Sequence, residues 1–253
     1  MEYMKILPIS HSDIIRKMKN ISTNPKERII VALDFSTIEE IQAAVIELRD
    51  FVGYFKVGLQ AINRIGTPKL IQEITNLGGQ IFFDGKFHDI PHTMEEATNS
   101  IASHVSMFTV HASAGSAALR TVAGAKGTSL LLVVTVLTSL SDEGAQEVFS
   151  QSAKDRVIGF AKLAAATGAD GIVCSPLELG QLASEQDLAK LIRVTPGIRP
   201  SWSDQGDQSR TATPRQAIEW GADYIVIGRP ITHPPKIIGS RKRAAQLILE
   251  EIS

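Results

Sequence analysis

Eight short runs of apolar and β-branched residues alternate along this chain with segments of helical periodicity, and this alternation restricts the fold more than any other feature. The runs are 29–33, 54–57, 80–83, 107–110, 130–137, 171–174, 192–195 and 224–227. Most begin roughly 20 to 30 residues after the preceding run, which is the length of one βα unit. We therefore predict an α/β protein with a single (β/α)8 TIM barrel domain.

The intervening segments support this prediction. Segment 37–50 places isoleucine, valine and leucine at steps of three and four residues, and segments 155–167 and 213–220 are further predicted helices. Glycines expected to end helices stand just before predicted strands, at Gly78, Gly168 and Gly221. An open doubly wound sheet is the alternative, but no Gly-x-Gly-x-x-Gly pattern follows any of the apolar runs.

Composition restricts the functional class. The 253 residues carry a net charge of -1, so no basic excess indicates nucleic acid or an anionic membrane as a partner. The single cysteine, Cys174, allows no intramolecular disulfide, and we expect it to pack in the core. No apolar run could span a bilayer, and the first 20 residues lack the apolar core of a secretory signal. We expect a cytoplasmic enzyme, with residues 1–27 as an extension and 28–253 as the barrel.

Charged residues gather where the first three runs end. Asp34 follows the first run, Lys56 lies in the second, and Asp84 and Lys86 follow the third, with Asp89 shortly after. Charged side chains at the end of a buried strand cost folding free energy unless they form ion pairs, and such a cost is usually kept only for a function. Because neighbouring barrel strands are about 5 Å apart, the first four charges are predicted to form one row of alternating sign, all ionised. The alternative is that they are solvated residues on the rim.

The last two runs indicate a phosphate site. The seventh leads into a Thr-Pro-Gly-Ile-Arg segment that ends at Arg199, and the eighth is followed by Gly228 and Arg229. Barrels of this kind often bind phosphate after strands seven and eight. Gly228 would let backbone N–H groups approach the anion and Arg229 would bind it with two hydrogen bonds. The alternative is a loop with a surface arginine.

No zinc-type spacing is present, and His88 and His111 are interpreted as structural hydrogen-bonding residues. We therefore predict no metal site from these residues.

Taken together, these residues resemble the orotidine 5'-phosphate decarboxylase family, from about residue 28 to the C-terminal helix. The motifs that carry the resemblance are Val-Ala-Leu-Asp at 31–34, Phe-Lys-Val-Gly at 55–58, Asp-x-Lys-Phe-His-Asp-Ile-Pro-x-Thr at 84–93, Val-Leu-Thr-Ser at 136–139, Thr-Pro-Gly-Ile-Arg at 195–199 with Gly-Asp-Gln at 206–208, and Ile-Gly-Arg at 227–229. Two positions depart from the family pattern. Gly85 stands where leucine is usual, and His92 where asparagine is usual.

The resemblance implies roles for the charge row. Asp34 and Lys56 would hold the ribose hydroxyls, Asp84 would lie against the substrate carboxylate, and Lys86 would protonate C6. Asp89 would come from the partner subunit of a homodimer and complete the row.

The resemblance also implies the remaining contacts to the substrate. Ile90 and Thr93 would lie beside Asp89, and the pyrimidine would contact Thr138 and Ser139. The phosphate would be bound by residues of the last two loops, namely Arg199, Gln208, Gly228 and Arg229, with the loop 199–208 closing over it.

The implied activity is cofactor-free decarboxylation of orotidine 5'-phosphate to UMP and CO2 in de novo pyrimidine biosynthesis. Two alternatives stay open. One is a Mg²⁺-dependent decarboxylase or aldolase of the same superfamily acting on a sugar phosphate, which EDTA would inhibit. The other is a non-catalytic barrel that binds UMP without turning a substrate over.

Overall fold

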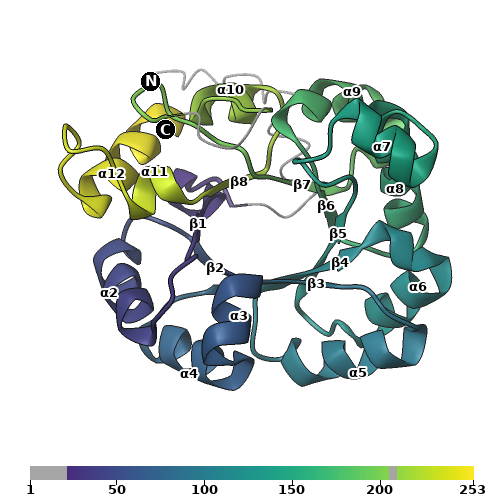
Figure 1. The fold of residues 1–253 in the computed structure, drawn as a ribbon, viewed down its shortest axis with the longest axis horizontal. Helices are drawn as coiled ribbons and strands as arrows, with labels where there is room; N and C mark the ends of the chain where they lie inside the picture. The colour runs from purple at the N-terminus through teal and green to yellow at the C-terminus, as the bar shows by residue number, and fades with distance from the viewer. Residues whose placement is uncertain (1–21, 205–209) are drawn as a thin grey trace, which may run out of the picture.

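Eight parallel strands close into a barrel in chain order, so that β1 pairs with both β2 and β8 (Figure 1). The computed structural model describes residues 22–204 and 210–253. The strands are β1 (Ile29–Ala32), β2 (Tyr54–Gly58), β3 (Ile81–Phe87), β4 (Met107–His111), β5 (Leu130–Val134), β6 (Gly171–Val173), β7 (Ile192–Thr195) and β8 (Tyr224–Ile227). The predicted (β/α)8 TIM barrel is confirmed, and residues 1–21 of the predicted extension lie outside the described part.

Helices surround the barrel on its outer side (Figure 1). The α-helices are α2 (Ile38–Leu48), α3 (Leu59–Ile65), α4 (Thr67–Asn76), α5 (Pro91–Ile101), α6 (Gly115–Ala125), α7 (Asp142–Phe149), α8 (Ala153–Ala166), α9 (Leu179–Ser184), α10 (Pro214–Glu219), α11 (Arg229–Thr232) and α12 (Arg241–Ile252). Short 3-10 helices are η1 (Pro25–Arg28), η2 (Ala112–Ala114), η3 (Pro176–Glu178) and η4 (Gln186–Leu188). Within the described ranges, none of these helices has the length and apolar character needed to cross a membrane.

Local chemistry explains where the predicted helices begin and end. Thr37 caps α2 through a capping box with Glu40, and Pro214 occupies the first turn of α10. The glycines expected to end helices have left-handed φ values, 78° at Gly78, 85° at Gly168 and 103° at Gly221. A side chain would strain this conformation, which accounts for glycine at these three junctions.

Two strands differ in length from the prediction by more than one residue. β5 ends at Val134 rather than at residue 137, and β3 continues to Phe87 rather than stopping at Phe83. The pairing of β3 with β4 shifts register between Phe83 and Phe87. The extra length of β3 therefore carries the charged residues 84 and 86 on an irregular strand instead of on the loop that follows it.

The barrel interior is filled by side chains from alternate strand positions, among them Ile30, Phe82, Met107, Leu132 and Val194. A second, larger apolar cluster fills the space between the strands and the helices. Since the strands are packed on both sides, they form a rigid support for the loops at their carboxyl ends.

A repeated Gly-Ala-Asp junction precedes β6 and β8 and has the same structural role in both places. Asp170 Oδ2 accepts a hydrogen bond from the backbone N–H of Leu131, and Asp223 Oδ2 accepts one from the N–H of Arg193. Each aspartate thus ties the start of its own strand to the strand before it.

Candidate active site

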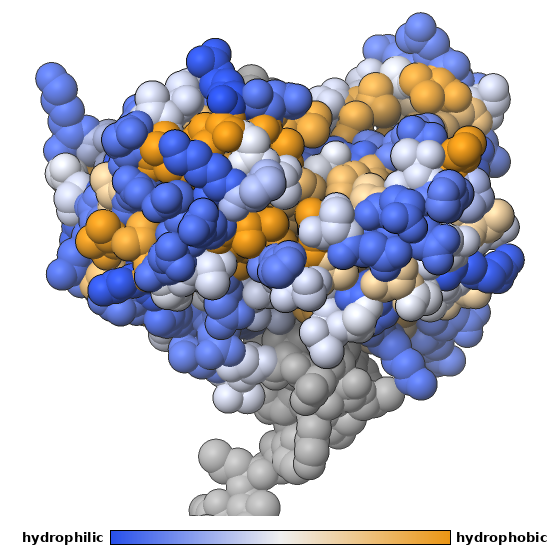
Figure 2. Space-filling view, turned by 90° about the horizontal axis from the view of Figure 1, so that it is seen from below, coloured by the Kyte–Doolittle hydropathy of each residue, from blue (hydrophilic) through white to orange (hydrophobic). Residues whose placement is uncertain are grey.

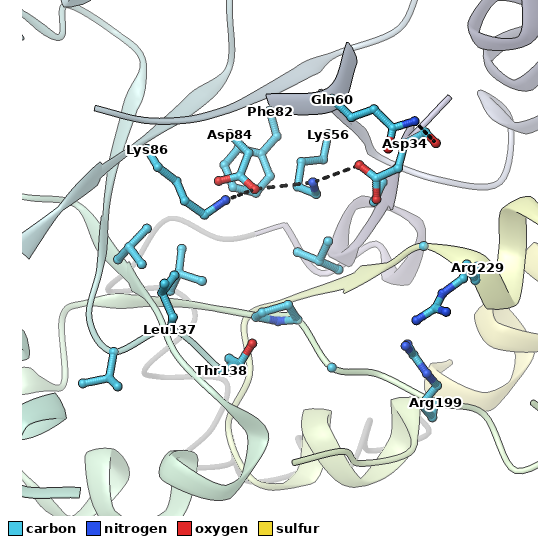
Figure 3. A pocket seen from close by; sticks show the side chains of 18 of the residues that line it. Asp34, Lys56, Gln60, Phe82, Asp84, Lys86, Leu137, Thr138, Arg199 and Arg229 are labelled. Atoms are coloured by element: carbon cyan, nitrogen blue, oxygen red, sulfur yellow. Dashed lines mark hydrogen bonds and ion pairs between the residues drawn. The ribbon is translucent and has the colours of Figure 1, made fainter. Parts of the chain in front are cut away.

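A cavity of about 640 Å³ opens at the carboxyl ends of the barrel strands. This is the end where TIM barrels place catalytic groups. The lining comes from most of the strands and the loops that follow them, and Figure 3 draws 18 of these residues as sticks. The lining residues are Ala32, Asp34, Lys56, Gln60, Phe82, Asp84, Lys86, Val134, Val136, Leu137, Thr138, Val173, Pro196, Gly197, Arg199, Val226, Gly228, Arg229 and His233.

The predicted row of alternating charge is present along one wall of the cavity (Figure 3). Lys86 Nζ lies 2.7 Å from Asp84 Oδ2, and Lys56 Nζ lies 3.4 Å from the same oxygen. Lys56 Nζ is also 3.7 Å from Asp34 Oδ1. The side chains of Lys56 and Asp84 are nearly buried, whereas that of Asp34 is 55% exposed. The part of the row that is most shielded from solvent is therefore the Lys56–Asp84–Lys86 triad, in which Lys86 is the most exposed member.

Opposite charges keep the buried members of the triad ionised. Burial by itself would lower the pKa of Lys56, but the attraction of Asp84 and Asp34 outweighs it and the pKa is raised. Burial would likewise raise the pKa of Asp84, but Lys56, Lys86 and a hydrogen bond from Thr109 hold it below its usual range. At neutral pH the cavity therefore contains a carboxylate between two ammonium groups.

Thr109, on β4, fixes the geometry of the triad and was not identified from the sequence. Its hydroxyl donates to Asp84 Oδ1 at 2.9 Å and accepts from the backbone N–H of Lys86 at 2.9 Å. The sequence feature that could have revealed it is the single hydroxyl of Thr109 among the apolar residues of a buried strand. A polar group there needs partners, and the partners turn out to be the two charged residues of the neighbouring strand.

Lys86 has φ 50°, a left-handed conformation that is uncommon for residues other than glycine. Such a conformation costs on the order of 1 kcal/mol and persists only where the surroundings enforce it. The register shift in β3 and the hydrogen bond to Thr109 supply that constraint. The backbone is thus bent so that Asp84 and Lys86 both line the cavity.

Gly85 is required for space rather than for a positive φ. A Cβ at this position would lie 2.5 Å from one ring carbon of Phe83 and 3.1 Å from one of Phe87. The two rings pack against each other, with centroids 5.9 Å apart. The usual leucine of the family could be accommodated only if these rings moved.

We expect Gly85→Ala to destabilise the protein by about 1–3 kcal/mol, the usual range for overpacking a core, in an equilibrium urea titration. Gly124→Ala is the matched control, because no atom lies within 4 Å of the Cβ that it adds on α6. That change should be neutral or stabilising by up to about 1 kcal/mol. Equal midpoints for Gly85→Ala and the unmodified protein would contradict the role given to the two rings.

Two arginines lie at the end of the cavity away from Lys86 (Figure 3). Arg199 follows β7 and is buried, and Arg229 follows β8 and is exposed. Gly228 also lines this end. These three residues are where the sequence predicts a phosphate site, and their spacing from the triad leaves room for the body of a ligand. Gln208, predicted to join them, lies outside the described residues, as does part of the loop 199–208.

Between these two ends the cavity wall is apolar, formed by Val134, Val136, Leu137 and Val173, with Thr138 beside them. An apolar wall with one hydroxyl suits a flat, partly polar ring. Of the two residues predicted to contact such a ring, Thr138 lines the cavity, whereas Ser139 is exposed and does not belong to the lining.

Asp89, Ile90 and Thr93 are exposed on the segment that leaves β3 and enters α5, and they do not line this cavity. Asp89 Oδ1 accepts a hydrogen bond from the N–H of Ile90. Their predicted role, in the site of a partner subunit, is taken up below.

Cys174 is fully buried, and burial raises the pKa of its thiol to about 12. It therefore packs in the core, as predicted, and is unsuited to act as a nucleophile. Within residues 22–204 and 210–253, no group of three or more His, Cys, Asp or Glu side chains is arranged to hold a metal ion.

Comparisons with known proteins agree on one family. Residues 27–238 match the model of the orotidine 5'-phosphate decarboxylase / HUMPS family. The chain is 44% identical to the orotidine 5'-phosphate decarboxylase of Syntrophomonas wolfei, over 82% of this chain and 91% of that protein. It is 41% identical to that of Heliobacterium modesticaldum, over 90% and 96%. The crystal structure of the Lactobacillus acidophilus enzyme superposes with a TM-score of 0.76 at 33% identity, covering 90% of this chain and 99% of that one.

Proposed function

The chain belongs to the orotidine 5'-phosphate decarboxylase / HUMPS family, and we propose that its buried triad performs the decarboxylation of orotidine 5'-phosphate to UMP and CO2. Orotidine 5'-phosphate decarboxylase activity, a step of pyrimidine biosynthesis, is what the names of relatives about 40% identical over most of the chain indicate. The observation that carries the mechanism is the close approach of Lys86, Asp84 and Lys56, with Lys86 Nζ 2.7 Å from Asp84.

Lys86 is the proton donor in this mechanism. The bond between C6 and the carboxylate breaks, CO2 leaves, and the electron pair stays on C6, where the ring gives it little resonance stabilisation. A preplaced ammonium group stabilises the developing negative charge and then transfers its proton to C6. Lys56 remains paired with Asp84 when that proton is given up, so the site keeps one cation throughout.

Asp84 lies beside Lys86, where it would face the carboxylate of the bound substrate. Its depressed pKa keeps it negatively charged, so it would repel the bound substrate carboxylate and favour loss of the neutral product CO2. The repulsion has to be offset by binding elsewhere. Arg199, Gly228 and Arg229 would provide it by holding the phosphate at the far end of the cavity, while Asp34 and Lys56 would hold the ribose hydroxyls.

We further propose that the active form is a homodimer whose two sites are shared. Ile90 is 64% exposed and Leu59, on α3, is also exposed. Figure 2 views the side of the barrel that α3, α4 and α5 cover and shows hydrophobic patches among the charged residues there. A second copy covering this side would bury these side chains and would carry Asp89 to the neighbouring cavity.

The decisive experiment follows the absorbance of orotidine 5'-phosphate after addition of the purified protein, with and without EDTA. We expect the absorbance to fall at the same rate in both. A rate abolished by EDTA would favour the Mg²⁺-dependent sugar-phosphate enzyme of the same superfamily. UMP binding with no change in substrate absorbance would favour the non-catalytic nucleotide-binding barrel.

A further inference from the structure

One arginine outside the cavity lining bridges two loops at the carboxyl end of the barrel. Arg210 lies in the connection between β7 and α10, and three of its atoms donate hydrogen bonds. Nε donates to the carbonyl of Thr138 at 3.3 Å and Nη2 to the carbonyl of Leu137 at 3.2 Å. Nη1 donates to Glu178 Oε1 at 2.7 Å. The guanidinium thus connects the segment after β5 with the one after β6.

Glu178 is a fixed point for this bridge. Its side chain is buried, and Oε2 accepts a hydrogen bond from the backbone N–H of Ser175 at 2.8 Å, which closes the capping box of η3. Burial raises the pKa of Glu178, and the contacts with Ser175 and Arg210 oppose this shift. A buried carboxylate of this kind needs a cationic partner, and Arg210 is that partner. The ion pair therefore also holds the Arg210 guanidinium in place.

At the other end of the bridge, the backbone of Leu137 and Thr138 has few hydrogen bonds that would hold it in place without Arg210. The ladder between β5 and β6 ends at the pairing of Val134 with Val173. Beyond it, the backbone N–H and the hydroxyl of Thr135 both donate to the carbonyl of Val173. Beyond this point, the hydrogen bonds of Leu137 and Thr138 to other elements in the described part of the chain come from Arg210. The N–H of Leu140 also donates to Leu137, but this bond closes only a local turn.

We propose that Arg210 is a positioning residue for the base: it fastens the backbone of Leu137 and Thr138 to Glu178 and so holds the wall of the cavity against which the pyrimidine packs. This inference rests on the proposed function, because that function places a pyrimidine against this wall. Arg210 itself does not line the cavity. Its effect would reach the base only through the two residues whose carbonyls it binds.

The test compares two ligands that differ by the base. UMP contains the pyrimidine, and ribose 5-phosphate does not. In Arg210→Ala and Arg210→Lys we expect the affinity for UMP, measured by calorimetry, to fall about 10- to 100-fold, up to the loss of about 100-fold that a misplacement of about 1 Å can cause in catalysis. The affinity for ribose 5-phosphate should change less than twofold. Lysine restores the charge beside Glu178 but cannot reproduce the planar fork that binds both carbonyls.

Arg243→Ala is the matched control, because Arg243 forms an exposed ion pair with Glu250 at 3.3 Å on α12. It should leave both affinities unchanged. An equal fall for UMP and ribose 5-phosphate in the Arg210 variants, or no fall for either, would overturn the inference. If Arg210→Ala does not fold, Arg210→Lys decides the question by the same criterion. Turnover by the unmodified protein is measured separately, so failure of the proposed function would be recognised on its own.

Discussion

Lys86→Ala should lower kcat/KM for orotidine 5'-phosphate by about 10⁵-fold. The loss combines two effects of one ammonium group. Removing a proton donor costs roughly 10²- to 10⁴-fold, and removing a preplaced charge beside a developing anion costs roughly 10²- to 10³-fold. The variant should still fold, because Asp84 keeps Lys56 at 3.4 Å and the hydrogen bond from Thr109. The measurement is the rate of substrate loss at limiting concentration, together with an equilibrium urea titration.

Lys162→Ala is a suitable control for this prediction, because Lys162 forms an ion pair with Glu185 at 2.8 Å on the surface. Lys162 does not line the cavity. Exposed pairs of this kind contribute little, and the variant should retain full activity. UMP should also still bind to Lys86→Ala, since most of the cavity wall is intact. A Lys86→Ala variant with activity within tenfold of the unmodified protein would rule out Lys86 as the proton donor.

The position of the site was predictable because its main residues sit at strand ends. A charge at the end of a buried apolar run costs free energy unless it is solvated, paired or functional, so several such charges on neighbouring strands indicate a candidate site. Asp34, Lys56, Asp84 and Lys86 could therefore be placed in one row from the sequence, and the distances confirm the row.

Other parts of the site depended on tertiary contacts that no local pattern contains. The partner of Asp84 on β4, Thr109, is 25 residues away, and the partner of Arg210, Glu178, is 32 residues away. The positive φ of Lys86 arises from the irregular pairing of β3 with β4. Helix α7 was not among the helices predicted from the sequence, and only Ala145 of its residues is buried, so its sequence contains few of the apolar residues that mark a helix packed on the barrel.

The exposure of Asp89 is the strongest reason to look for a shared site. A carboxylate within the triad's own motif would be expected to line the same cavity, yet the chain turns away after β3 and Asp89 is exposed. The neighbouring Ile90 is exposed as well, although burying an isoleucine side chain is favourable by roughly 1.5–3 kcal/mol. A second copy resolves both features, because it would cover Ile90 and would receive Asp89 into its own charge row.

Mixing two inactive variants tests this arrangement. Lys86→Ala and Asp89→Ala subunits are each expected to be inactive as homodimers. If Lys86 acts within its own chain and Asp89 acts across the interface, as proposed, a mixed dimer would have one site with both defects and one site with neither. Half of the dimers are mixed after random exchange, and half of their sites are intact. We therefore expect the mixture to recover about a quarter of the unmodified activity.

The matched control mixes Lys86→Ala with Asp84→Ala. Both residues line the cavity of their own chain, so every site in a mixed dimer carries one defect and no activity should return. Two different affinity tags, purified in sequence, establish that mixed dimers have formed. If they form and the Lys86→Ala and Asp89→Ala mixture stays inactive, Asp89 does not act in the partner's site. Recovery in that mixture alone would mean that β3 supplies Lys86 to the cavity of its own chain, while the segment after β3 supplies Asp89 to the partner's cavity.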